Sequence, residues 1–219
     1  MTVCGQGLRE GLFYREFLKP ADPPILHNLR EFSVLNLSRL YGYEKAHVDH
    51  VARLSLSLFD QFSRLHGYGD LEREYLWAAA QLHDIGAIVD YYDHHKHSAY
   101  IVLSTGLPGY SHRETALIAL LCLYHRKGAP DLAPYRKLLE AGDARRVNRL
   151  AALLRLAEYL DRSRTQAVTR LNVRISDRRA RLGVKARSRT EGRVEVWEAR
   201  RNASFFELAF GCKLEIEQE

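Results

Sequence analysis

Residues 77–87 have the sequence WAAAQLHDIGA, which contains the most informative feature of the chain. A run of small and apolar residues ends in the adjacent pair His83 and Asp84, and Gly86 then lets the chain leave the helix. Adjacent histidine and aspartate side chains near a helix end can hold one divalent metal ion together. Imidazole nitrogen suits zinc, iron, cobalt, nickel and manganese, and carboxylate oxygen suits magnesium and manganese. The pair therefore predicts a hydrolytic metal site, and not a thiol-rich zinc fold.

Other candidate ligands are spread along the chain, at or near the ends of predicted helices: His47, His97, His125 and Asp161. Each also has a structural interpretation, as a cap near the negative end of a helix dipole or as part of a buried polar network without metal. His94 and His95 fall in a tyrosine-rich loop. For these two we favour surface positions or substrate contacts over metal ligation.

Helical periodicity dominates the first three quarters of the chain. Apolar residues recur at helical spacing over residues 25–40 and 44–66, from Asp70 as N-cap to Asp84, over 112–124, and through RVNRLAALLRLAEYLDRSR. After Gln166, LNVRIS and ARLGVKA alternate as a hairpin does, followed by a helix over 194–210 and a strand KLEIEQ. We expect a mainly α protein: a lead-in segment (1–27), a helical bundle (28–165) and a small α+β subdomain (166–219).

Composition restricts the class of protein. With 219 residues and 46% apolar content, the chain can bury one sizeable core. Its three cysteines are far apart and lack CxxC spacing, so neither a disulfide framework nor a cysteine zinc site is expected. No signal peptide or apolar run of membrane-spanning length occurs. We expect a cytoplasmic protein with no membrane partner.

The net charge is +6 and the sequence pI is about 9.3, with arginine concentrated in the C-terminal third. A basic surface favours an anionic phosphate-containing ligand such as a nucleotide, polyphosphate or nucleic acid. A solvated basic face is the equally weighted alternative, and homodimerisation stays open.

The order of the candidate ligands carries a resemblance. His47, then His83 with Asp84, then Asp161 are similar to the H…HD…D pattern of the HD phosphohydrolase superfamily. More specifically, several motifs in order resemble the C-terminal half of the exopolyphosphatase and guanosine pentaphosphate phosphohydrolase (Ppx/GppA) family: GQGLREGLFY, HDIG followed by HHKHSAYIV and LPGY, YHRK, RLAEYLDRSR and FFELAFGCKLEIE. The resemblance implies an HD-domain helical bundle followed by the small α+β subdomain.

The family usually begins with an actin-like phosphatase fold that carries phosphate-binding loops and a catalytic glutamate. No glycine-rich phosphate loop precedes a helix in this sequence, so we expect that the chain alone does not degrade long polyphosphate processively. It could instead work with a separate Ppx/GppA catalytic domain.

The resemblance also implies roles for the candidate residues. Asp84 would bridge two metals, with His47, His83 and Asp161 on the first and His97 and His125 on the second. The cofactor would be one or two divalent ions (Mn, Fe, Co, Ni, Zn or Mg), with His83 and Asp84 as the catalytic pair. Nearby cations would hold the phosphates: Lys96, Arg126, Lys127, Arg162 and Arg164. The leading function is a metal-dependent phosphohydrolase or phosphodiesterase acting on a nucleotide or polyphosphate-like substrate, and the alternative is a non-catalytic module that binds polyphosphate or a nucleotide.

Overall fold

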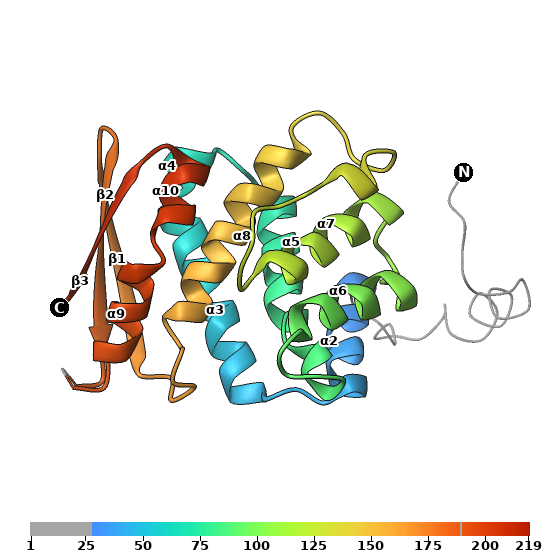
Figure 1. The fold of residues 1–219 in the computed structure, drawn as a ribbon, viewed down its shortest axis with the longest axis horizontal. Helices are drawn as coiled ribbons and strands as arrows, with labels where there is room; N and C mark the ends of the chain where they lie inside the picture. Colours follow the sequence, from blue (N-terminus) through green and yellow to red (C-terminus); the bar gives the residue numbers. More distant parts are fainter. Residues whose placement is uncertain (1–27, 189) are drawn as a thin grey trace, which may run out of the picture.

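The computed structural model describes residues 28–188 and 190–219, and the predicted lead-in segment lies outside them. Helices form the larger part, and a small sheet lies at one end of the molecule (Figure 1). The helices are α2 (Leu29–Tyr41), α3 (Lys45–Gln61), α4 (Ser63–His66), α5 (Asp70–Leu82), α6 (His94–Thr105), α7 (His112–Tyr124), α8 (Asp143–Tyr159), α9 (Arg193–Arg201) and α10 (Ser204–Phe210). Two short 3-10 helices, η2 (Ile85–Ile88) and η3 (Ala133–Tyr135), lie between them. The predicted fold class, mainly α with a small α+β part, is confirmed.

The bundle is built around α7, the helix whose sequence is apolar on most sides. Residues 115–122 of α7 are all buried, because α5, α6 and α8 pack around it. Ser111 caps its first turn through Glu114 N, and the Glu114 carboxylate accepts from Ser111 N in return. This capping box fixes where α7 begins and therefore where His125, directly after its last residue, is placed.

The C-terminal sheet has the strand order β1 (Val168–Ser176), β2 (Arg179–Ala186), β3 (Lys213–Gln218). β1 and β2 form the predicted antiparallel hairpin, while β3 pairs with β2 in parallel after the crossover through α9 and α10. Leu182, Val184, Leu214 and Ile216 are buried on one face, and charged residues alternate with them on the other. This alternation is typical of a sheet with one solvated face.

Three predicted element boundaries differ from the structure. The helix expected over 44–66 is interrupted at Phe62, where α3 ends and α4 begins. The helix expected over 194–210 is interrupted between α9 and α10 at residues 202–203. Asp70 is the first residue of α5 and not its N-cap: Gly69 takes that place, and its N–H donates to the Glu72 carboxylate.

Aromatic packing explains the interruption at Phe62. The fully buried Phe62 ring lies 4.8 Å from the Phe206 ring and 6.0 Å from the Phe210 ring, measured between centroids. Apolar residues of the bundle and of the C-terminal segment thus form one continuous buried cluster. In the described part of the chain, no helix combines the length and apolar character needed to cross a bilayer.

Because the Phe62–Phe206 contact joins the two parts, Phe206→Ala is expected to destabilise both. A large cavity at a buried aromatic costs about 3–5 kcal/mol. Hydrogen-exchange mass spectrometry in mild denaturant should show equal loss of protection for peptides from α8 and from β2. Leu208→Ala, on the exposed side of α10, is the control and should change neither. Loss of protection confined to residues 168–218 would mean that the C-terminal segment unfolds separately.

Candidate metal centre

The ends of five helices converge on one cluster of histidines and carboxylates. α3 contributes His47 in its first turn, and α5 and α7 end at His83 and His125. α6 begins at His94, and α8 brings Glu158 in its last turn. Asp84 follows His83 directly. Three of these helices present their C-terminal ends, where the helix dipole favours a positive charge.

Four of the histidines are fixed in the same way, through a hydrogen bond donated by Nδ1. His83 donates to Ala80 O, His94 to Tyr91 O and His125 to Cys122 O, each at 2.7 Å. His47 Nδ1 lies 2.8 Å from Asp161 Oδ2. Carbonyl and carboxylate oxygens only accept, so Nδ1 carries the proton in all four rings. Nε2 is thereby left as the atom that can bind a metal, which is the usual arrangement for histidine ligands.

The Nε2 atoms of His47 and His83 point at the same carboxylate. Glu158 Oε2 lies 3.2 Å from His47 Nε2 and 3.3 Å from His83 Nε2. Asp84 is close to both rings, with separations of 3.9 and 3.8 Å. These two Nε2 atoms, Asp84 Oδ1 and Glu158 Oε2 are all buried without a hydrogen-bond partner. A divalent cation would satisfy such a set of atoms, so the residues present fit a metal ion.

A second group shares Asp84 with the first. His94 Nε2 lies 3.3 Å from Asp84 Oδ1 and 3.1 Å from His125 Nε2. Burial is the main reason that the pKa of His125 is lowered to about 3, so this ring is neutral and its Nε2 presents a lone pair. Two facing Nε2 atoms need a cation or a shared proton between them. Asp84 with His94 and His125 therefore forms a second potential metal-binding group, beside Asp84 with His47 and His83.

The cluster carries excess negative charge. Burial alone would raise the pKa of both Asp84 and Glu158, but the neighbouring histidines hold the pKa of Asp84 at about 2 and that of Glu158 well below its usual range. Burial would also lower the pKa of His47, yet its interactions with Asp161 and Glu158 raise it to about 9. In the metal-free chain a proton on His47 therefore offsets part of the charge, and metal binding would displace that proton.

Gly86 allows α6 to approach the segment that carries His83 and Asp84. A Cβ atom at this position would lie 2.2 Å from His94 O and 2.3 Å from Ser98 N, which is too close for any side chain. Ser98 completes the contact, since its hydroxyl accepts from Gly86 N and donates to His83 O. The glycine of the HDIG motif thus sets the distance between His94 and Asp84, beyond its predicted role of releasing the chain from α5.

Two predicted ligands lie near the cluster without entering it. Asp161 is buried, but one of its oxygens binds His47 Nδ1 and the other accepts from Gln166 N. It orients His47 from the side opposite to the metal groups. His97 lies one turn beyond His94 on α6, and the ligand groups found among the described residues include His94 and not His97.

One of the five predicted phosphate-binding cations contacts the cluster. The Arg164 guanidinium donates to Asp84 Oδ2 at 2.6 Å and to Glu44 Oε2 at 2.7 Å. Arg126 donates to Tyr92 O, and Lys96 pairs with Asp93. Arg162 and Lys127 are exposed.

Sequence reasoning missed two members of the cluster. The first is His94, which is buried together with His95, whereas surface positions or substrate contacts were favoured for both. Asp93 directly precedes α6, which begins at His94. A histidine in the first turn of a helix that follows HDIG was the sequence signal that could have identified His94 as a cluster member. Glu158 stands in a run that is apolar apart from Arg155 and Tyr159, LAALLRLAEYL, at a position that faces the core. A carboxylate in such a stripe is the signal that could have identified it.

Three other buried histidines, His50, His66 and His95, lack the hydrogen bond that Nδ1 donates to a fixed oxygen in the cluster. His66 donates from Nε2 to Phe59 O and accepts at Nδ1 from Tyr68 N, so both ring nitrogens are occupied. His50 accepts at Nδ1 from Arg53, the reverse of the pattern in the cluster. Burial, followed by the charge of Lys127, lowers the pKa of His95 to about 4. These contrasts set the four anchored histidines apart.

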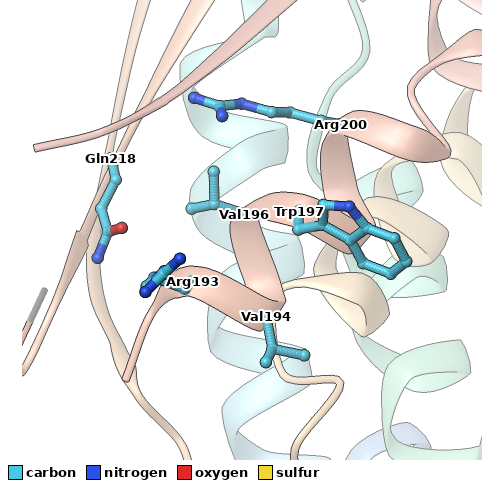
Figure 2. A pocket seen from close by; sticks show the side chains of 6 residues that line it. All are labelled: Arg193, Val194, Val196, Trp197, Arg200 and Gln218. Atoms are coloured by element: carbon cyan, nitrogen blue, oxygen red, sulfur yellow. The ribbon is translucent and has the colours of Figure 1, made fainter. Parts of the chain in front are cut away.

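A separate groove of about 530 Å³ lies between α9 and the end of β3 (Figure 2). None of its lining residues belongs to the cluster. They are Arg193, Val194, Val196, Trp197, Arg200 and Gln218. Arg200 Nε donates to Ile216 O, which fixes the side chain across the groove.

Comparison with known protein families gives one match that spans both parts of the fold. Residues 29–195 match the family model described as "Ppx/GppA phosphatase, domain III". The matched interval includes every residue of the cluster, the β1–β2 hairpin and the start of α9.

Glu158→Gln is expected to abolish metal retention at the first group, because it removes a charge that faces two Nε2 atoms. Asp161→Asn should weaken metal affinity by about 10- to 100-fold, the usual cost of losing a residue that orients a ligand. His97→Gln, outside both groups, is the matched control and should leave affinity unchanged. Equilibrium dialysis against Mn²⁺ and Co²⁺ with elemental analysis measures all three. Wild-type metal content in Glu158→Gln, or its loss in His97→Gln, would overturn the assignment.

Proposed function

The chain belongs to the Ppx/GppA phosphatase domain III family, and from that premise we propose that it is an HD-type, metal-dependent phosphohydrolase or phosphodiesterase. Its substrate is a phosphate ester such as a nucleotide, or a polyphosphate-like anion. His47, His83, Asp84 and Glu158 hold one divalent ion, and Asp84, His94 and His125 hold a second. This ligand set replaces Asp161 by Glu158 and His97 by His94 relative to the sequence prediction.

The proposal rests on one observation: four histidines are fixed through Nδ1, and their Nε2 atoms gather beside the buried carboxylates Asp84 and Glu158. A purely structural polar network would pair its donors with its acceptors. Here the Nε2 atoms of His47 and His83 converge on the same oxygen, Glu158 Oε2, at 3.2 and 3.3 Å, in positions that do not meet hydrogen-bond geometry. The energetic cost of such atoms supports an ion as the missing partner.

The chain's own residues supply positioning and charge. A bound divalent ion would lower the pKa of water toward neutrality and polarise a phosphoryl oxygen. Asp161 keeps His47 in the Nδ1–H tautomer. Arg164, on the solvent side of Asp84, is half-buried and carries two guanidinium nitrogens that a phosphate could take over from Asp84 and Glu44. We assign Arg164 the role of binding the non-reacting phosphate oxygens.

The groove between α9 and β3 favours a second candidate function, a non-catalytic module that binds an anionic ligand or a separate Ppx/GppA catalytic domain. Arg193 and Arg200 line it beside the half-exposed Trp197 (Figure 2). Binding there would be independent of metal. It would weaken with salt, because counterions are released as charges are neutralised.

The enzyme proposal predicts metal-stimulated turnover of bis-para-nitrophenyl phosphate or of a member of a nucleotide panel. Activity should be lost on chelation, return with Mn²⁺, Fe²⁺, Co²⁺ or Ni²⁺, and fall to background in His83→Ala. Arg164→Gln should lower kcat/KM by about tenfold or more, since a charge-assisted hydrogen bond is worth about 1.5–3 kcal/mol.

Arg162→Gln is the matched control for Arg164→Gln, as both substitutions remove one guanidinium from the same turn. No turnover of any substrate with any metal, together with metal-independent binding of polyphosphate that Arg193→Gln weakens, would replace the enzyme by the binding module.

A further inference from the structure

Four large apolar side chains are exposed within five residues, from the last residue of η2 into the loop before α6. Ile88 is 63% exposed, Val89 61%, Tyr91 52% and Tyr92 78%. Contiguous exposed apolar side chains on a soluble protein commonly mark a binding surface. We refer to residues 88–92 as the tyrosine loop.

The tyrosine loop lies directly beside the second ligand group. The Tyr91 ring is 5.8 Å from the His94 ring and 6.1 Å from the Tyr92 ring, measured between centroids. Tyr91 O is the acceptor that anchors His94 Nδ1. A substrate phosphate at Asp84 and His94 would therefore have the Tyr91 ring as its neighbour.

Positive charge borders the same loop. The Arg126 guanidinium donates to Tyr92 O and lies 6.0 Å from the centre of the Tyr91 ring. Lys96 Nζ donates to Asp93 Oδ2 at the end of the loop, at 3.0 Å. Flat aromatic surface and cations thus occur together next to the buried carboxylates.

We propose that the tyrosine loop is a stacking surface for the base of a nucleotide, with Tyr91 and Tyr92 against the ring and Arg126 near the phosphates. This deepens the proposed function and rests on it, because the phosphate end of the nucleotide is placed at the metal groups. An inorganic phosphate chain has no ring to cover the two tyrosines. The structure therefore assigns base-bearing phosphates as preferred ligands over linear polyphosphate of equal charge.

The test compares ligands that differ in the ring. Isothermal titration calorimetry with Ca²⁺ measures binding of ATP, GTP and inorganic tripolyphosphate to the full chain. The double variant Tyr91→Leu/Tyr92→Leu keeps apolar surface and the backbone carbonyls but removes both rings. It should weaken nucleotide binding by at least about fivefold, the lower end for loss of base–aromatic stacking, and leave tripolyphosphate binding unchanged. Tyr100→Leu, at an exposed tyrosine further along α6, is the control and should alter neither ligand.

Equal affinity of wild-type protein for nucleotides and tripolyphosphate, or equal weakening of both in the double variant, would overturn the proposal. So would an unchanged nucleotide affinity accompanied by a shift from dimer to monomer in light scattering, which would make the loop a protein interface. Ring-selective binding without turnover of any phosphate ester would refute hydrolysis and keep the stacking surface. Turnover without ring selectivity would support hydrolysis and refute the stacking surface.

Discussion

The site depends on one repeated constraint, the hydrogen bond donated by Nδ1 of His47, His83, His94 and His125 to a fixed oxygen. Three of the acceptors are backbone carbonyls located three residues earlier, so the fold itself selects the tautomer. Once Nδ1 is committed, Nε2 of His47 and of His83 faces Glu158 at 3.2 and 3.3 Å, and Nε2 of His94 faces Asp84 at 3.3 Å. His125 Nε2 lies 3.1 Å from His94 Nε2 and shares a potential metal-binding group with Asp84.

The rest of the bundle can be understood as the support for this arrangement. Helices α5, α7 and α8 end at the cluster, which brings three negative dipole ends to a place where a cation would be stabilised. Gly86 removes the side chain that would hold α6 away. Of the three buried carboxylates Asp84, Glu158 and Asp161, Asp84 alone is paired with the guanidinium of Arg164, so a divalent ion would complete the compensation of charge.

Sequence predicted the helical bundle, the hairpin and the pair His83–Asp84, because helical periodicity and adjacency are local properties. It could not choose between His94 and His97, or between Glu158 and Asp161. His94 and His97 lie on the same side of α6, separated along the axis by about 4.5 Å. Asp161 follows Glu158 by three residues but lies just beyond the end of α8. For α6, the choice depends on how far the helix is translated against its neighbours, and Gly86 and the Ser98 contact fix that position in three dimensions. The interruption at Phe62 was equally hidden, since its partner Phe206 is distant in sequence.

The central claim is that four histidines present Nε2 to metal while Nδ1 stays protonated. Long-range ¹H–¹⁵N correlation spectra of ¹⁵N-histidine-labelled protein, titrated with Zn²⁺ and assigned with single histidine variants, measure this directly. We expect the Nε2 resonances of His47, His83, His94 and His125 to shift on metal addition, with their Nδ1 resonances remaining those of protonated nitrogen and His66 unchanged. Metal-induced shifts at Nδ1, or no shift at any of the four rings, would contradict the account.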